Sequence, residues 1–275
     1  MLKVSITILF IYNCLLVKSQ VYNEQMSFNR EIIYDYIFFN DSTQLNKPSN
    51  QKMSLLLNDS LSLFQLTSRY SRDSTLIHDK KSISAKVFGV ISPISNTNYR
   101  IFKSKNKIIT VESIKGFDIK LTNDFQFYEE ESMDPSLWNI YQDTLTINNL
   151  LCQKASVNWK GRTWICWFSP EIPIFEGPYK FSGLPGLIVK IQDTKGFFTF
   201  ELQVIKEVNK YYNPNIRKDI IYNHISKEEF FKRKKSFLNN MYEIAISEGI
   251  EPDESSKKNA IRFGKENNNW IELYP

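Results

Sequence analysis

Short apolar runs, bounded by Asn, Asp, Ser and Gly, follow one another along the chain from residue 29 to residue 205. They are rich in β-branched and aromatic side chains and show no helical period, so the pattern predicts β-strands. In Phe197–Ile205, apolar and polar residues alternate from position 198 on, which is typical of an antiparallel sheet with one buried face. The other predicted strands are Ile32–Phe39, Met53–Leu57, Leu61–Leu66, Tyr99–Phe102, Ile108–Val111, Phe117–Leu121, Leu151–Val157, Arg162–Phe168 and Leu187–Ile191.

One long helix is predicted from Lys227 to Gly249. Ser226 stands three residues before Glu229, which is the spacing of a capping box, and a glycine at the end of such a run stops a helix. Between these signals the apolar residues recur at helical spacing, at Phe230, Phe237, Met241 and Ile244.

The stretch from Glu251 to Asn269 is polar, and we expect it to be loose, with Trp270–Leu273 returning as a last short strand. A single helix that follows many strands most simply packs against one face of their sheet. We therefore predict a mostly β (α+β) fold. It is a curved antiparallel sheet, or a partly open barrel or bowl, with one long C-terminal helix packed on it.

The first 19 residues have the pattern of a secretory signal peptide. Lys3 is followed by an apolar run from Val4 to Val17 and then by the small residue Ser19, and this run is too short for a membrane span. We expect cleavage before Gln20 and export of the chain. Residues 20–275 then form a single sheet-rich domain with no transmembrane span.

The backbone path is most tightly specified between Cys152 and Asp193. Five of the nine glycines lie between positions 161 and 196, and four of the ten prolines between positions 170 and 185. Gly161 suits a left-handed position that closes a hairpin between the strands at 151–157 and 162–168. The prolines predict an extended crossover over Ser169–Pro178. Gly183–Gly186 then turns the chain, in a type II or similar turn.

A disulfide between Cys152 and Cys166 is predicted. These are the only cysteines of the predicted mature chain, they lie on the two arms of one hairpin, and an exported protein meets an oxidising compartment. Direct pairing needs a register in which, for example, Ser156 faces Arg162. Other turns shift that register by one or two residues.

A six-residue sequence in this stretch resembles the signature of the GLPGLI family, since Gly183, Leu184, Pro185, Gly186, Leu187 and Ile188 spell it in order. The resemblance implies a bacterial protein of the periplasm or cell surface, or a secreted one, with no established activity. The hexapeptide has no side chain that transfers protons, so we interpret it as a structural signature. Flanking residues also resemble the family, at Lys154-Ala155, Gly161-Arg162, Trp167-Phe168 and Gly177-Pro178.

Sequence motifs for chemistry are few. The chain has two histidines, His78 and His224, and no C-x-x-C or H-x-x-x-H spacing, so we expect no metal site and no cofactor. The acids at Glu129–Glu131, with Glu171 and Glu176, are the candidates for a hydrolase that uses paired carboxylates, although runs of acids are usually solvated. We name no catalytic residue.

Charge excludes one class of partner. The formal net charge is +5, with acids and bases mixed along the chain, which is no footprint of a nucleic-acid-binding protein. The single basic cluster, Lys232–Lys235, is interpreted as the wet face of a helix, with a contact to an anionic lipid or glycan as the alternative.

These patterns favour an exported, non-enzymatic binding or envelope accessory protein. Its curved sheet would hold an apolar small ligand, a peptide or a segment of an envelope protein partner, with the Ser169–Pro178 crossover as a rigid rim. Trp164, Trp167 and Glu171 are the possible ligand contacts, and the alternative for the two tryptophans is a place in the core. The rival hypotheses are a periplasmic hydrolase and a purely structural envelope component.

Overall fold

The computed structural model describes residues 25–68, 97–114, 124–212, 221–247, 249 and 253–273. The predicted signal peptide at residues 1–19 and the predicted strand Phe117–Leu121 lie outside the described residues. Within the described part of the chain, no helix is both long and apolar enough to cross a bilayer.

Twelve strands form one sheet within the described residues, in the order β12-β6-β5-β4-β3-β2-β1-β11-β10-β9-β8-β7. All neighbours are antiparallel except β12 and β6, which run parallel. The strands are β1 Met26–Phe38, β2 Ser49–Leu57, β3 Ser62–Leu66, β4 Arg100–Lys103, β5 Lys107–Glu112, β6 Asp124–Glu131, β7 Asn139–Ile147, β8 Leu150–Trp159, β9 Arg162–Ser169, β10 Leu187–Asp193, β11 Phe198–Tyr212 and β12 Ile221–His224.

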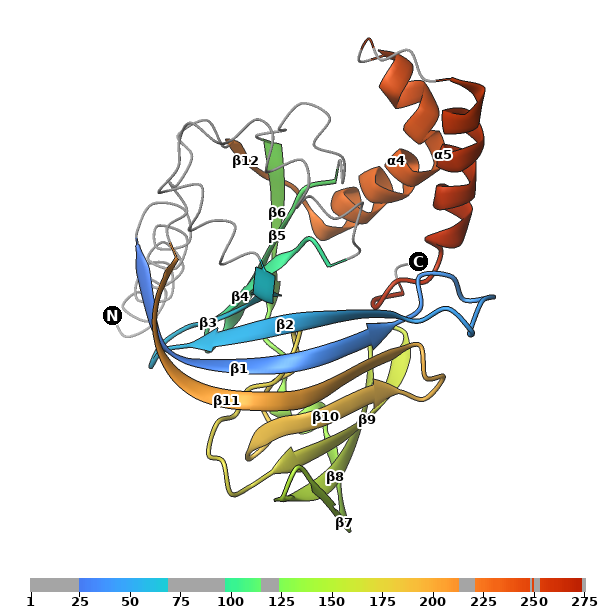
Figure 1. The fold of residues 1–275 in the computed structure, drawn as a ribbon. Helices are drawn as coiled ribbons and strands as arrows, with labels where there is room; N and C mark the ends of the chain where they lie inside the picture. Colours follow the sequence, from blue (N-terminus) through green and yellow to red (C-terminus); the bar gives the residue numbers. More distant parts are fainter. Residues whose placement is uncertain are drawn as a thin grey trace, which may run out of the picture.

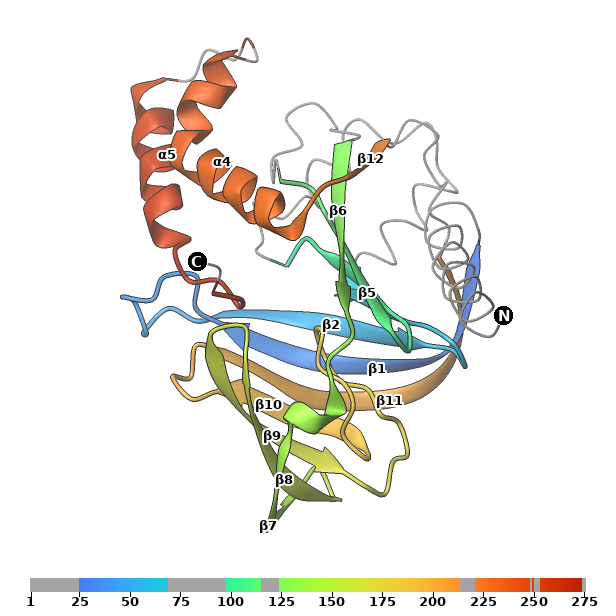
Figure 2. The same cartoon turned by 180° about the vertical axis from the view of Figure 1, so that it is seen from behind.

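The sheet is strongly twisted. In Figure 1, β1, β2 and β11 run across the middle of the molecule, β10 to β7 lie below them, and β5 and β6 rise above them. Figure 2 shows the same arrangement from behind, with the two helices standing over β1 and β2 beside β6. A mostly β fold built on a curved sheet is therefore confirmed.

Both faces of the sheet are buried around β2 to β5. Leu55 and Phe64 belong to the main hydrophobic core, whereas their chain neighbours Leu56 and Leu63 belong to a second cluster. Successive residues of a strand point to opposite faces, so both faces are apolar here. A strand with one solvent-exposed face alternates apolar and polar residues. Leu63 and Phe64 are adjacent apolar residues because both faces of the sheet are buried here.

β1 joins the two halves of the sheet. It pairs with β2 on one side and with β11 on the other, where Met26 faces Tyr212 and Phe38 faces Phe198. The carboxylate of Glu31 is buried in this region and accepts a hydrogen bond of 2.6 Å from Lys210 Nζ, 179 residues away in the sequence.

The β8–β9 hairpin does not contain the predicted disulfide between Cys152 and Cys166. Its turn has two residues, Lys160 and Gly161, both with positive φ, as in a type I′ turn. This turn places Trp159 opposite Arg162 and Ala155 opposite Cys166, so the predicted register is wrong. Cys152 lies three residues farther along β8, and both cysteines are buried, free thiols.

The Gly183–Ile188 segment packs against the crossover at 169–178. Leu187 N donates to Ile172 O, and Ile188 N donates to Glu176 O. The type II turn is not formed, because Gly186 N instead bonds to Leu184 O two residues back, which makes a γ-type turn centred on Pro185. A Cβ atom on Gly186 would overlap the carbonyl of Ser169.

The C-terminal part contains two helices, where the sequence predicted one. α4 spans Lys227–Ser247 with a kink at Asn240, and α5 spans Glu254–Glu266 and packs against it. The prediction of a loose tail is wrong because Asp253 caps α5, accepting from the backbone N–H of Ser256 at 2.7 Å. Trp270–Leu273 does return to the sheet, but as an irregular segment and not as a strand.

Candidate functional site

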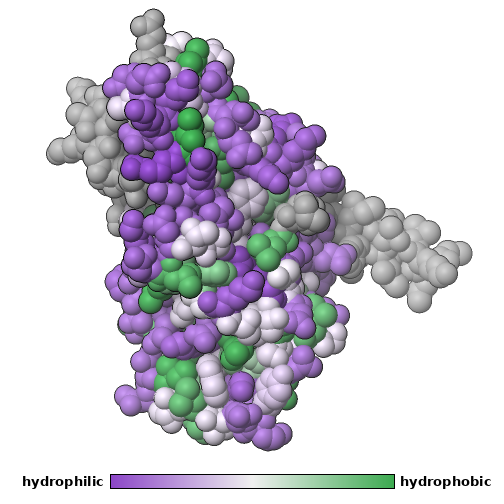
Figure 3. Space-filling view, turned by 90° about the vertical axis from the view of Figure 1, so that its right-hand side faces the viewer, coloured by the Kyte–Doolittle hydropathy of each residue, from purple (hydrophilic) through white to green (hydrophobic). Residues whose placement is uncertain are grey.

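A cleft of about 730 Å³ lies between α4, the end of α5 and the irregular residues that follow α5. Its apolar lining consists of Phe231, Leu238, Trp270 and Leu273. Seen from the right-hand side of Figure 1, the surface is mainly hydrophilic with scattered apolar areas (Figure 3). Polar side chains complete the lining of the cleft, at Glu228, Lys232, Lys235, Asn239, Asn267, Asn268 and Glu272.

One stripe of α4 forms a wall of the cleft. Glu228, Phe231, Lys235, Leu238 and their neighbours recur three or four residues apart, the spacing that places side chains on one face of a helix. Opposite this wall, a Cβ atom on Gly264 of α5 would overlap the carbonyl of Leu238. The glycine therefore lets the two helices approach closely at the cleft.

Residues 267–273, which we call the C-terminal segment, form the other wall and are bound along their length to the sheet. Arg162 of β9 donates to the carbonyl of Trp270 at 2.6 Å and to the side-chain oxygen of Asn269 at 2.8 Å. Leu273 N donates to the carbonyl of Lys160 at 3.0 Å. The β8–β9 turn thus positions the segment that carries Trp270 into the cleft.

The buried carboxylate of Glu272 holds the C-terminal segment in place. This carboxylate accepts from Lys180 Nζ at 2.6 Å and from the Tyr179 hydroxyl at 2.6 Å, and it pairs with Lys227 Nζ at 2.5 Å. Burial alone would raise the pKa of Glu272, but the ammonium groups of Lys180 and Lys227 outweigh this and lower it to about 2. The carboxylate is therefore ionised at neutral pH, and each of its oxygens is in an ion pair with a lysine.

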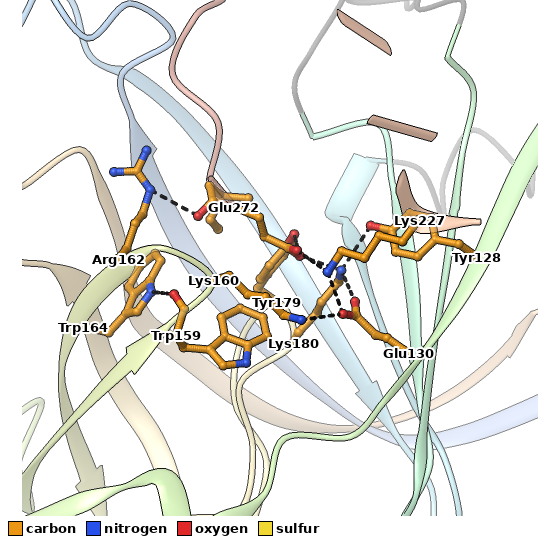
Figure 4. Close-up of polar contacts among 11 residues, drawn as sticks. Tyr128, Glu130, Trp159, Lys160, Arg162, Trp164, Tyr179, Lys180, Lys227 and Glu272 are labelled. Carbon is orange, nitrogen blue, oxygen red and sulfur yellow. Dashed lines mark hydrogen bonds and ion pairs between the residues drawn. The ribbon is translucent and has the colours of Figure 1, made fainter. Parts of the chain in front are cut away.

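A second carboxylate, Glu130 of β6, completes the charged cluster. It pairs with Lys180, with Lys227 at 2.7 Å and with Lys160 at 3.2 Å. Figure 4 shows Lys180 and Lys227 converging on Glu130 and Glu272, with Tyr128 and Tyr179 beside them. Three ammonium groups thus face two carboxylates, so the cluster carries one net positive charge.

Behind Phe231 and Trp270 lies a smaller inner cavity of about 40 Å³ with mainly aromatic walls. Tyr99 and Thr110 line it, and their hydroxyls have no hydrogen-bond partner among the described residues. A space of this size accommodates one small polar molecule. The Phe231 and Trp270 rings, 5.7 Å apart, separate it from the outer cleft.

The three ligand contacts suggested by the sequence do not line the cleft. Trp164 is fully buried in the main core, against Phe181. Trp167 is partly buried on the same core, and Glu171 is exposed at the start of the crossover. The crossover contributes no residue to the cleft, so the structure brings none of these residues together there.

The acidic run Glu129–Glu131 divides between the two faces of β6. Glu130 enters the charged cluster, whereas Glu129 pairs with Lys107 at 3.3 Å and Glu131 is exposed. Glu176 is held at 2.5 Å by the buried Lys103. Among the described residues, no three His, Cys, Asp or Glu side chains lie close enough to hold a metal ion.

The residues that build the cleft and its support had little or no sequence signal. Glu272 and Lys180 stand alone in their local sequence, and Lys227 opens a helix of many charges. Trp270 was expected to dock back, but nothing indicated what it would face. The signal that existed was the basic run at Lys232–Lys235, of which Lys232 and Lys235 line the cleft.

Comparison with protein families gives one local match. The model described as "Protein of unknown function (Porph_ging)" matches residues 153–190, which include β8 from Gln153, β9, the crossover and the first residues of β10. Residues of the cleft lie outside this segment. The resemblance to the GLPGLI family stays a prediction. No curated protein matches the chain.

Comparison with solved structures shows a likeness of fold. The structure of PNGF-II in space group P21 shares 13% identity at a TM-score of 0.50, over 75% of this chain and 33% of that chain. Its structure in space group C2 gives 13% identity, a TM-score of 0.49, and coverage of 75% and 32%. The chain thus spans about a third of the length of PNGF-II. At this identity the likeness concerns the fold alone.

Proposed function

We propose that this protein is a binding protein that holds a small ligand with an apolar body in the cleft between α4, α5 and the C-terminal segment. The observation that carries the proposal is the cleft volume of about 730 Å³, which lies within the range of about 300–1,000 Å³ found for small-molecule sites. Apolar side chains surrounded by a few polar groups are the usual lining of such sites. Export, predicted from residues 1–19, would place the ligand outside the cytoplasm.

The carboxylates near the cleft favour binding over hydrolysis. A glycosidase-type hydrolase needs one carboxyl group that carries a proton and a second one that is ionised. Glu272 has a pKa of about 2 and is engaged by two lysines and a tyrosine. Glu228 is the other carboxylate in the lining. This arrangement supports a site without acid–base chemistry.

The proposal is tested with N-phenyl-1-naphthylamine, a neutral apolar dye whose fluorescence rises in apolar surroundings. We expect saturable binding to the native protein. Asn239 is exposed and lines the cleft, whereas Asn259 of α5 is exposed and does not. Asn239→Trp would fill the cleft and weaken dye binding at least about tenfold, and the matched Asn259→Trp would leave it unchanged.

Near-ultraviolet circular dichroism checks that both variants keep the native packing. No saturable dye binding by the native protein, or equal weakening by the two variants, would refute the assignment of the cleft. Mass spectrometry of an organic extract from natively purified protein then identifies the bound compound.

A further inference from the structure

We infer that the ligand carries an acidic group, and that Lys232 and Lys235 bind it at the mouth of the cleft. The inference rests on the proposed function and specifies its ligand as an anionic amphiphile, a small molecule with one acidic group and an apolar body. It is carried by the lining of the cleft, in which two exposed lysines stand beside apolar residues.

The four basic residues at 232–235 fall into two pairs. Arg233 bonds to Glu229 at 2.6 Å, and Lys234 pairs with Glu112 at 2.7 Å. Lys232 and Lys235 instead line the cleft, and neither forms an ion pair with any residue that the structure describes. Two members of the basic run therefore form ion pairs, and the two that form none among the described residues both line the cleft.

The balance of charge in the cleft is positive. Its lining contains two carboxylates, Glu228 and Glu272. Glu272 is compensated by Lys180 and Lys227, which leaves Glu228 against Lys232 and Lys235. The buried cluster beneath the C-terminal segment adds a further net positive charge, since Lys160 also pairs with Glu130. An anion in the cleft thus meets a surplus of ammonium groups.

Three carbonyl groups at and just after the end of α5, which would attract a cation, already accept hydrogen bonds. The end of α5 points its last carbonyls toward this region, and free carbonyls at a helix C-terminus favour cations. The carbonyls of Phe263 and Lys265 accept from the side-chain amides of Asn267 and Asn268, at 2.8 Å each. The carbonyl of Asn267 accepts from the Trp270 indole at 3.1 Å.

The spacing of the two lysines suits one shared acidic group. Residues three apart on a helix are neighbours, with Cβ atoms about 5–6 Å apart, and the long lysine side chains allow both ammonium groups to reach one anion. Phe231 and Leu238 lie on the same wall of α4, and Trp270 lies across from them. An acidic group at the lysines would therefore leave the rest of the ligand against apolar side chains.

The test compares two dyes that share one aromatic body. 8-Anilinonaphthalene-1-sulfonate carries a sulfonate, and N-phenyl-1-naphthylamine lacks it. We expect the native protein to bind the sulfonate dye at least about tenfold more tightly, because hydrogen bonds to charged groups contribute about 1.5–3 kcal/mol. The double variant Lys232→Gln/Lys235→Gln is expected to lose this preference, so that it binds the two dyes with similar affinity.

A matched control removes two charges elsewhere. Lys258 and Lys265 of α5 are exposed and do not line the cleft, so Lys258→Gln/Lys265→Gln should keep the preference for the sulfonate dye. If the neutral dye binds but the sulfonate dye binds no more tightly, or if both double variants lose the preference equally, the inference fails and the proposed function stands. If neither dye binds, the proposed function itself fails.

Discussion

The ammonium group of Lys180 lies 2.6 Å from a carboxylate oxygen of Glu272, 92 residues later in the chain, and both side chains are buried. Lys180 follows the crossover, and Glu272 lies in the C-terminal segment that walls the cleft. The pair therefore couples the packing of the sheet to the position of Trp270. We therefore expect loss of the Glu272 carboxylate to lower the free energy of unfolding more than loss of an exposed carboxylate does.

Glu272→Gln is expected to destabilise the protein by about 3–5 kcal/mol, because it leaves the buried ammonium of Lys180 without its main partner. Urea denaturation at pH 7 measures the change in the free energy of unfolding. Glu266→Gln is the matched control, since Glu266 is 4.0 Å from Arg262 in a solvent-exposed pair, which contributes little. Equal midpoints for the two variants would contradict the importance of the buried pair.

The same carboxylate predicts how stability depends on pH. Its pKa is lowered from 4.5 to about 2 in the folded protein, so its contribution of about 3 kcal/mol is fully present above pH 4.5 and is lost as the pH falls toward 2. We expect the free energy of unfolding to decline over this window. Glu272→Gln should show a shallower decline, and parallel curves for the two proteins would argue against this assignment.

Gly186→Ala is expected to lower the yield of folded protein sharply, because the added Cβ atom would overlap the Ser169 carbonyl in the backbone of the crossover. Gly196→Ala provides the comparison. Gly196 has a φ of +72° but open space around it, so alanine there costs about 1–2 kcal/mol of backbone strain. Soluble yield and urea midpoints distinguish the effect of steric overlap at position 186 from that of backbone strain at position 196. A mild effect at position 186 would show that the backbone of the crossover moves to accommodate the Cβ atom.

Cys152 and Cys166 are expected to resist alkylation in the native protein. Both thiols are buried, and burial raises the pKa of each, so little thiolate is present to react. Iodoacetamide labelling followed by intact mass measurement should show both thiols free and unmodified under native conditions, and both labelled in urea. A mass two units lower, with a bridged peptide joining the two cysteines, would contradict the β8–β9 register.

Local pattern was sufficient for most of the strands and for the start of α4. Phe198 and Phe200 alternate with polar residues and do lie in a strand, and Ser226 does cap the helix, accepting from Glu229 N at 3.1 Å. The register of β8 against β9 was not predictable with the same ease. It depended on Lys160 adopting positive φ next to Gly161. Lysine rarely adopts positive φ, and no local sequence pattern predicts it here.

The candidate site depends on contacts between residues far apart in the sequence, which no local sequence pattern predicts. A run of acids is normally solvated, yet the alternation of β6 turns Glu130 inward to meet lysines from positions 160, 180 and 227. β7 was missed for the opposite reason, since it is an edge strand that is exposed along nearly its whole length. Its apolar residues, among them Ile140 and Leu145, are exposed and separated by polar ones, so no continuous apolar run marks the strand.

The place of β1 between β2 and β11 has a consequence for the order of folding. β1 is made early and can pair with β2 at once, but its other edge finds its partner only when β11 exists, as the Glu31–Lys210 bond across 179 residues illustrates. Closing so long a loop is slow, because chain entropy is lost before the contacts form. We therefore expect the pairing of β1 with β11 to be a slow step of folding, and the closure of the C-terminal segment over Lys180 to depend on it.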